Sequence, residues 1–276
     1  MTTSSIAVPT LVRAPLATGA GGRLKWAFAD MLTITKRNLI AYTRIPEALF
    51  FSTVQPIMFV LLFTYVFGGA IHPPNGVPYV NYLMPGIFVQ TVAFGSVSTS
   101  IGLAEDLQKG LIERFRALPM ARSAVLAGRT SADLVRNVIV VIIVSAVGFA
   151  VGFRPTTGVL AYLGGIGIIL LFAYALSWGF AFVGLSAANS ETAQVMSFPI
   201  LFPLIFASSA FVPVSQMPDW LRGFATYQPV SVVVAACRGL MIGGPTATWV
   251  IQALAWTIGL LVVLIPLAVW RYRTRT

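Results

Sequence analysis

No Asp, Glu, Lys or Arg occurs between Glu47 and Glu105, and the polar residues 72–76 divide this stretch into two apolar halves. A helix needs about 20 apolar residues to cross the hydrocarbon core of a bilayer, so each half is long enough to span it. Hydrophobic residues make up 57% of the chain and charged residues only 9%, whereas soluble domains contain about 25% charged residues. The sequence therefore excludes a soluble globular or disordered protein and predicts a polytopic membrane protein.

The same criterion predicts an all-α fold with six transmembrane helices. They cover about residues 49–70, 80–104, 134–153, 159–185, 194–212 and 249–270. Pro199 and Pro203 lie inside the fifth span, where each removes a backbone hydrogen bond, and the resulting kink is either packing geometry or a hinge. Residues 1–22 lack the charged start and apolar core of a secretion signal, so we expect a disordered tail, followed by a membrane domain over 23–276.

The distribution of positive charge predicts the orientation. With both termini in the cytoplasm, fifteen of the 18 Lys and Arg residues lie on that side, and only Arg154, Arg222 and Arg238 lie on the other. Because Lys and Arg in short loops stay in the cytoplasm, we expect a multi-pass protein of the plasma membrane with both termini cytoplasmic. The net charge of +10 then reflects topology and attraction to membrane lipid, and it does not indicate nucleic-acid binding.

An amphipathic helix is predicted over residues 24–44. Its apolar stripe comprises Leu24, Phe28, Met31, Leu32, Thr35, Leu39 and Tyr42. Charged side chains occupy the other side, and helices of this kind lie in the membrane interface. Trp26 and Ile40 interrupt the polar side, so the helix is either an anchor alone or also a contact for a cytoplasmic partner.

Charge is most concentrated after the second predicted span, where ten of the 26 charged residues lie between positions 105 and 136. Glu105 and Lys109 are four residues apart, which predicts a helix that continues out of the span into water. Leu107, Leu111 and Phe115 begin an apolar stripe on this helix, which Leu118 completes. Such a stripe must be buried, either against the protein's own helices or in a partner protein.

Two regions carry motifs of a known family. The first includes the runs ERFRALPM at 113–120 and LAGR at 126–129; the second includes FVP, MPDWL, QPV and RGL between 211 and 240. With these motifs the chain resembles the permease subunits of type-2 ABC exporters, in particular the daunorubicin/doxorubicin-resistance branch. The resemblance covers about residues 36–270.

This resemblance implies how the chain is energised. Residues 105–118 would form the coupling helix, which sits in a cleft of a separate ATPase subunit. Its implied contact residues are Glu105, Asp106, Leu107, Leu111, Glu113, Arg114, Phe115 and Arg116. ATP is then used by that partner, and this chain binds no cofactor itself. We expect two permease chains side by side, either identical or related.

The region before the last span resembles the family's extracellular re-entrant helices. Prolines divide it into pieces too short to span a bilayer, and Trp220 suits the headgroup level. Arg222 and Arg238 are costly in hydrocarbon, so we expect them to reach the surface, Asp219 or backbone carbonyls. The segment is either a structural lid or a substrate-binding site.

Side-chain chemistry narrows the function. With 19 Phe and 8 Met, the spans favour a hydrophobic or amphipathic substrate, which would be a drug or, in the alternative, a lipid or polysaccharide. No predicted span centre contains a charged residue, which argues against an ion-coupled secondary transporter or a channel. His72 is the only histidine and Cys237 the only cysteine, so we expect no catalytic residues and no metal site.

Overall fold

A computed structural model describes residues 20–44, 46–71, 73, 76–113 and 122–275 of the chain. Within these ranges the chain is helical and contains no strand, which confirms the predicted all-α class. Most of the tail predicted over residues 1–22 lies outside the described residues, and residues 20–22 already belong to the first helix.

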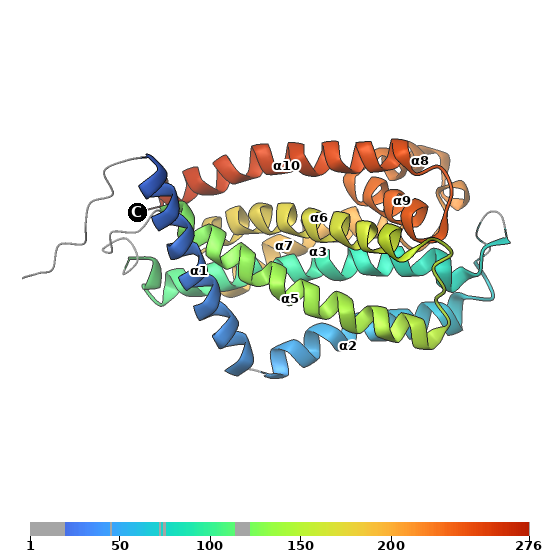
Figure 1. Cartoon of the computed structure of the whole chain (residues 1–276), viewed down its shortest axis with the longest axis horizontal. Helices are drawn as coiled ribbons and strands as arrows, with labels where there is room; N and C mark the ends of the chain where they lie inside the picture. The colour runs from blue at the N-terminus through green and yellow to red at the C-terminus, as the bar shows by residue number, and fades with distance from the viewer. Residues whose placement is uncertain (1–19, 45, 72, 74–75, 114–121, 276) are drawn as a thin grey trace, which may run out of the picture.

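The described helices lie mainly side by side along one axis. In chain order they are α1 (Ala20–Arg44), α2 (Pro46–Leu62), the π-helix η1 (Phe63–Phe67), α3 (Tyr79–Gln108), α5 (Arg122–Val151), α6 (Val159–Ser186), α7 (Ser190–Phe206), the 3-10 turn η3 (Val214–Gln216), α8 (Asp219–Tyr227), α9 (Pro229–Ile242) and α10 (Ala247–Thr274). Figure 1 shows α1 and the C-terminus at one end of the bundle, the α1 end, and α8 and α9 at the opposite end, the α8 end.

Within the described ranges, four helices are long and apolar enough to cross a membrane, namely α3, α5, α6 and α10. The α8–α9 pair passes the same test but bends by 68°, as a broken span or a re-entrant hairpin does. Residues Ser52–Phe67 and helix α7 are apolar but shorter. The chain is therefore a polytopic membrane protein, while its count of six spans stays a prediction.

Helix α3 is the centre of the bundle. It contacts α2, α5, α6, α7 and α9, and 78% of its most apolar window is buried, against 11% for α10. Small residues allow this close packing. A Cβ atom at Gly184 of α6 would lie 2.7 Å from the Cα of Ser100 in α3, closer than real Cβ atoms approach. The two backbones are therefore in direct contact.

The segment after α3 differs from the prediction. A single helix over 105–118 is wrong, because α3 ends at Gln108 and helix resumes only at Leu111. Gly110 lies between them with a φ of +65°, a left-handed conformation that favours glycine and ends helices. Residues 114–121, which include the rest of the predicted stripe, lie outside the described residues.

Helix α5 begins at Arg122, well before the predicted start of the third span at residue 134. The apolar helix therefore includes three charged residues that the prediction placed at the edge of the third span or before it. They are Arg129, Asp133 and Arg136. They extend the helix because they are spaced three and four residues apart and pair with one another.

Helix α1 packs across α5 at the α1 end. Ile34 is buried against Gly128, and the Thr35 hydroxyl donates to the Gly128 carbonyl at 3.1 Å. The side chains of Trp26, Phe28 and Leu32 stay about half exposed. One face of α1 therefore binds the bundle while a second, apolar face is free for lipid, as an interfacial helix requires.

Helix α7 runs through both Pro199 and Pro203 without ending. Its first turn is capped by Asn189, whose side chain accepts a hydrogen bond from the Thr192 amide at 2.7 Å. The predicted hinge at the two prolines stays a prediction, since the helix is continuous across them.

Two glycines of α6 provide a test of the contact with α3. Gly184→Ala should lower the unfolding temperature by several degrees, because the added methyl group meets the Ser100 backbone. Gly164→Ala is the matched control, since a Cβ there meets nothing within 4 Å. It should leave the temperature unchanged or raise it, because alanine favours helix. Equal unfolding temperatures for the two purified variants would contradict the backbone contact between α3 and α6.

Candidate functional site

Charged side chains from α1, α3 and α5 meet at the α1 end in a series of ion pairs, here called the ion-pair chain. Asp106 of α3 lies 3.4 Å from Arg37 Nη2 and 3.9 Å from Arg129 Nη1. Asp133 of α5 lies 3.8 Å from Arg129 Nε and 3.9 Å from Arg136 Nη2. The ion-pair chain thus links the end of α3 to the interior of the bundle.

The inner end of the ion-pair chain is deeply buried. The Asp133 side chain is 0% exposed and accepts a hydrogen bond from the Thr99 hydroxyl. Arg136 donates to the carbonyl oxygen of Gly95, which lies near the middle of α3. Arg136 lies at the start of the predicted third span, 134–153, so the prediction that no span centre carries a charge stays a prediction. A buried charge is tolerated here because each one is paired.

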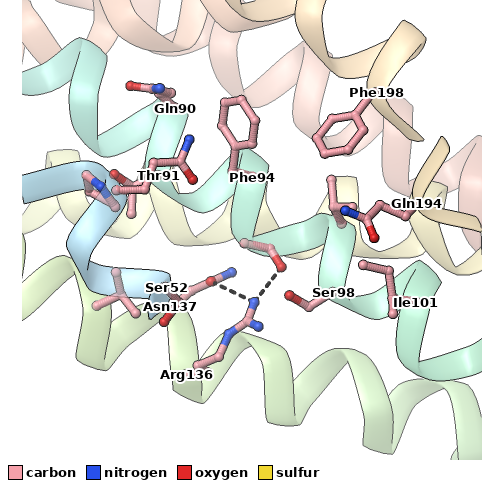
Figure 2. Close-up of a pocket in the computed structure, with 15 residues that line it drawn as sticks. Ser52, Gln90, Thr91, Phe94, Ser98, Ile101, Arg136, Asn137, Gln194 and Phe198 are labelled. Carbon is pink, nitrogen blue, oxygen red and sulfur yellow. Dashed lines mark hydrogen bonds between the residues drawn. The ribbon is translucent and has the colours of Figure 1, made fainter. Parts of the chain in front are cut away.

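A cavity of about 410 Å³ opens beside Arg136, between α2, α3, α5 and α7 (Figure 2). This volume lies within the range of sites that hold drug-sized ligands. Its lining residues are Ser52, Gln55, Pro56, Gln90, Thr91, Phe94, Gly95, Val97, Ser98, Ile101, Arg136, Asn137, Val140, Gln194 and Phe198. The cavity is thus mixed in chemistry, with amides, hydroxyls and one guanidinium group among apolar side chains.

Three buried polar side chains of this lining lack hydrogen-bond partners for one atom each within the described part of the chain. The atoms are Gln90 Oε1, Thr91 Oγ1 and Asn137 Nδ2, and their residues are 2%, 7% and 2% exposed. An unsatisfied buried polar atom costs about 1–3 kcal/mol of stability. These three atoms are themselves buried and do not face the cavity.

Aromatic rings form another part of the cavity wall. Phe94 of α3 and Phe198 of α7 both line the cavity, and Phe202 contacts both of their rings. Its ring centroid is 5.9 Å from that of Phe94 and 5.4 Å from that of Phe198, both edge-to-face. Such a cluster offers apolar area and ring edges to an aromatic ligand.

The predicted coupling residues lie partly at the end of α3. Glu105 pairs with Lys109 at 3.3 Å, as their spacing predicts, and Asp106 belongs to the ion-pair chain. Leu107 packs against a cluster of the protein's own core that includes Trp178 and Tyr272. Leu107, the first residue of the predicted apolar stripe, is thus packed against the protein's own helices.

The remaining coupling residues follow the turn at Gly110. Leu111 is half-buried and Glu113 is exposed. Arg114, Phe115 and Arg116 lie outside the described residues. Docking of this segment to an ATPase stays a prediction.

At the α8 end, Arg222 and Arg238 contact backbone carbonyls or Asp219, as the sequence predicts. Arg238 donates to the carbonyl oxygens of Tyr82, Ser209 and Ala210 at 2.9, 2.7 and 3.0 Å. Arg222 lies 2.6 Å from Asp219 and donates to the Met217 carbonyl.

Trp220 is 81% exposed, as a headgroup-level side chain is. None of Asp219, Trp220, Arg222 and Arg238 lines the cavity of Figure 2, and the alternatives of a structural lid and a substrate-binding site both stay open.

The functional residues that the prediction missed are the polar groups of the cavity and its charged neighbours. The polar groups of the cavity come from four helices, α2, α3, α5 and α7, and only one signal in the sequence points to their charged neighbours. Arg129, Asp133 and Arg136 have i,i+4 and i,i+3 spacing, which is typical of charges paired on one helix. Within the described ranges, no three His, Cys, Asp or Glu side chains are grouped to hold a metal ion.

The buried carboxylate offers a stability test. Asp133→Asn should lower the free energy of unfolding by about 3 kcal/mol or more, because Arg129 and Arg136 then lose a buried partner. Asp219→Asn is the control, since its carboxylate is 90% exposed in its pair with Arg222, and it should cost under about 1 kcal/mol. Denaturant titration of both purified variants in detergent measures the difference. Equal losses would show that the ion-pair chain does not stabilise the bundle.

Comparison with known proteins places the chain in a family. Residues 29–242 match the family model described as ABC-2 type transporter. A daunorubicin-resistance ABC transporter permease of Streptomyces coeruleorubidus is 34% identical over 93% of this chain and 91% of its own. A probable doxorubicin-resistance ABC transporter permease of Mycobacterium tuberculosis is 28% identical over 90% of both chains. The fold, its apolar helices and these matches agree: the chain belongs to the ABC-2 type transporter family.

Proposed function

We propose that this chain is the permease subunit of an ATP-driven exporter and that it moves amphipathic, drug-like molecules across the cytoplasmic membrane. The cavity beside Arg136 is the observation that carries this proposal, because it combines drug-sized volume with aromatic and hydrogen-bonding walls. Relatives that match most of the chain are named for resistance to daunorubicin and doxorubicin, which supports a substrate of this kind.

Energy enters this transporter from a separate ATPase subunit. The segment around Glu105 and Glu113 is the docking site, and it begins in the last turn of α3, the central helix. The ion-pair chain connects Asp106, at the end of α3, to Arg136 at the cavity. A displacement of the docking segment is therefore transmitted to the cavity wall through paired charges and a rigid helix.

Both termini lie in the cytoplasm in this proposal. Helix α1 and the C-terminus share the α1 end of the bundle, as Figure 1 shows. Arg271 and Arg273 lie in the last turn of α10, and the ion-pair chain is at the same end. Positive residues concentrate on the cytoplasmic side of membrane proteins, so the α8 end is extracellular.

A second permease chain completes the transport pathway. Helices α2 and α7 border the cavity, and each exposes a glutamine that lines it, Gln55 and Gln194. A polar side chain facing lipid tails is unfavourable, so these faces are turned toward a second chain and the pathway between them. The partner is an identical or a related permease.

The docking segment can be tested in cells that express the tagged chain together with its ATPase. Glu113→Ala and Phe115→Asp should keep the chain in the membrane but reduce co-purification of the ATPase and resistance to daunorubicin, because they remove charge and apolar area from the docking site. Asp219→Asn, at the opposite end, is the control and should retain both. Normal resistance in both docking variants would reject the docking role, and failure of the unaltered chain to capture any ATPase would reject the proposed function.

Orientation is tested by cysteine labelling of intact cells with a membrane-impermeant maleimide. Asn75→Cys should react from outside and Gln108→Cys should not, because Asn75 precedes α3 in the sequence and Gln108 is its last residue, so the proposed orientation puts them on opposite sides. The native Cys237 is fully buried, so it contributes little background. Labelling at position 108 but not at 75 would reverse the topology.

A further inference from the structure

Two glycines of α3 lie opposite two arginines of the ion-pair chain. A Cβ atom at Gly102 would lie 2.8 Å from Arg129 Nη1 and closer still to Nη2. A Cβ atom at Gly95 would lie 3.2 Å from Arg136 Nη2. Real Cβ atoms rarely come so close to a neighbour. Each guanidinium group therefore occupies a notch that exists because α3 carries no side chain at that position.

The notches give the guanidinium groups access to carbonyl oxygens inside α3. Arg136 donates to the Gly95 carbonyl, and Arg129 Nη2 donates to the Ser98 carbonyl at 3.4 Å. A side chain on a helix covers the turn that precedes it, so a side chain at position 102 would lie over Ser98. Figure 2 shows the Arg136 side chain reaching from α5 to α3, with dashed lines to its acceptors. These bonds therefore depend on the two glycines.

Together the two notches fix the register of α3 against α5. The two glycines are seven residues apart and so are the two arginines, a spacing of about two helical turns. Between the notches, the Thr99 hydroxyl donates to the Asp133 carboxylate. A shift of one helix by one turn would break all three contacts at once. The matched positions, here called the α3–α5 seam, are Gly95 with Arg136, Thr99 with Asp133 and Gly102 with Arg129.

The ion pairs within α5 do not by themselves hold this register. Arg129 and Arg136 lie 3.8 and 3.9 Å from Asp133, which belongs to the same helix. Such pairs stabilise α5 but do not tie it to α3. The ties across the seam include the bonds to the α3 carbonyls, the bond from Thr99 and the pair of Arg129 with Asp106. The first of these ties need the notches.

The seam lies between the docking segment and the cavity. Asp106, which pairs with Arg129, is one turn beyond Gly102, whereas Gly95 and Arg136 line the cavity. We propose that Gly95 and Gly102 are positioning residues for transport: they seat the two guanidinium groups, so that α3, α5 and the cavity wall follow the docking segment in one register. This proposal rests on the proposed function and names the residues that hold the ion-pair chain in place.

The first test compares unfolding temperatures of the purified full-length chain. Gly102→Ala should lower the temperature by several degrees, because its methyl group displaces the Arg129 guanidinium. Arg129→Lys keeps the charge but lacks the terminal nitrogen atoms that meet this methyl group. In that background Gly102→Ala should cost little or nothing, which also provides a folded variant if the single one does not fold. Gly164→Ala, where a Cβ meets nothing within 4 Å, is the control and should cost nothing in either background.

The second test measures coupling in the chain co-purified with its ATPase in lipid nanodiscs. Gly102→Ala should still capture the ATPase, but stimulation of ATP hydrolysis by daunorubicin should fall about tenfold, because a displaced Arg129 no longer ties α5 to α3. Adding Arg129→Lys should restore part of the stimulation. The daunorubicin concentration for half-maximal stimulation should stay unchanged, since Gly102 does not line the cavity. Gly95→Ala should raise that concentration, because its methyl group displaces Asn137 and Arg136 in the cavity wall.

Different results would overturn the two parts of the proposal. Equal losses of stability from Gly102→Ala in the two backgrounds would show that Arg129 does not sit in the notch. Full stimulation in Gly102→Ala, or none in the unaltered complex, would show that the notch has no part in transport. An unaltered chain that captures no ATPase would reject the proposed function and the role in transport with it. The unfolding temperatures would still decide whether the notch seats Arg129.

Discussion

Direct backbone contact along α3 is the constraint on which the rest of the bundle depends. Gly184 of α6 sits against Ser100, and Gly86 of α3 sits against the backbone at Ala210. In a membrane, apolar side chains gain little by leaving lipid for protein, so close packing of small residues has to hold helices together. This packing leaves α3 almost no lipid contact and explains why its polar residues, such as Gln90 and Asn81, are buried in protein. The cavity and the ion-pair chain both follow from this central position.

The ion-pair chain shows how the family's membrane helices can carry charge. Asp133 is surrounded by Arg129, Arg136 and the Thr99 hydroxyl, so its negative charge is compensated within two turns of helix. The desolvation of each group is offset only because all of them are present together. Charge is therefore concentrated where three helices meet and is absent from the lipid-facing side of α5, which exposes Ile139 and Ile142.

The parts of this structure that the sequence predicts correctly are those that depend on the residues of a single helix. The fourth predicted span, 159–185, nearly coincides with α6 because an uncharged apolar run leaves no other choice. The start of α5 was missed because Arg129, Asp133 and Arg136 look like loop residues until their partners are known. The charge pattern predicted a continuous helix through this segment, but the left-handed backbone conformation of Gly110 interrupts it. The cavity could not be predicted, because whether Gln90 or Asn137 finds a partner depends on neighbours from other helices.

The contacts of Arg238 have a mechanical consequence. Its guanidinium group binds carbonyl oxygens of Tyr82, in the first turn of α3, and of Ser209 and Ala210, in the turn after α7, and it also lies 3.5 Å above the Tyr82 ring. One side chain from α9 thus fastens three separate segments into a single rigid body. The hairpin of α8 and α9 cannot swing open while this clamp holds. Any opening at the α8 end must then move these three segments together and cannot come from bending between them.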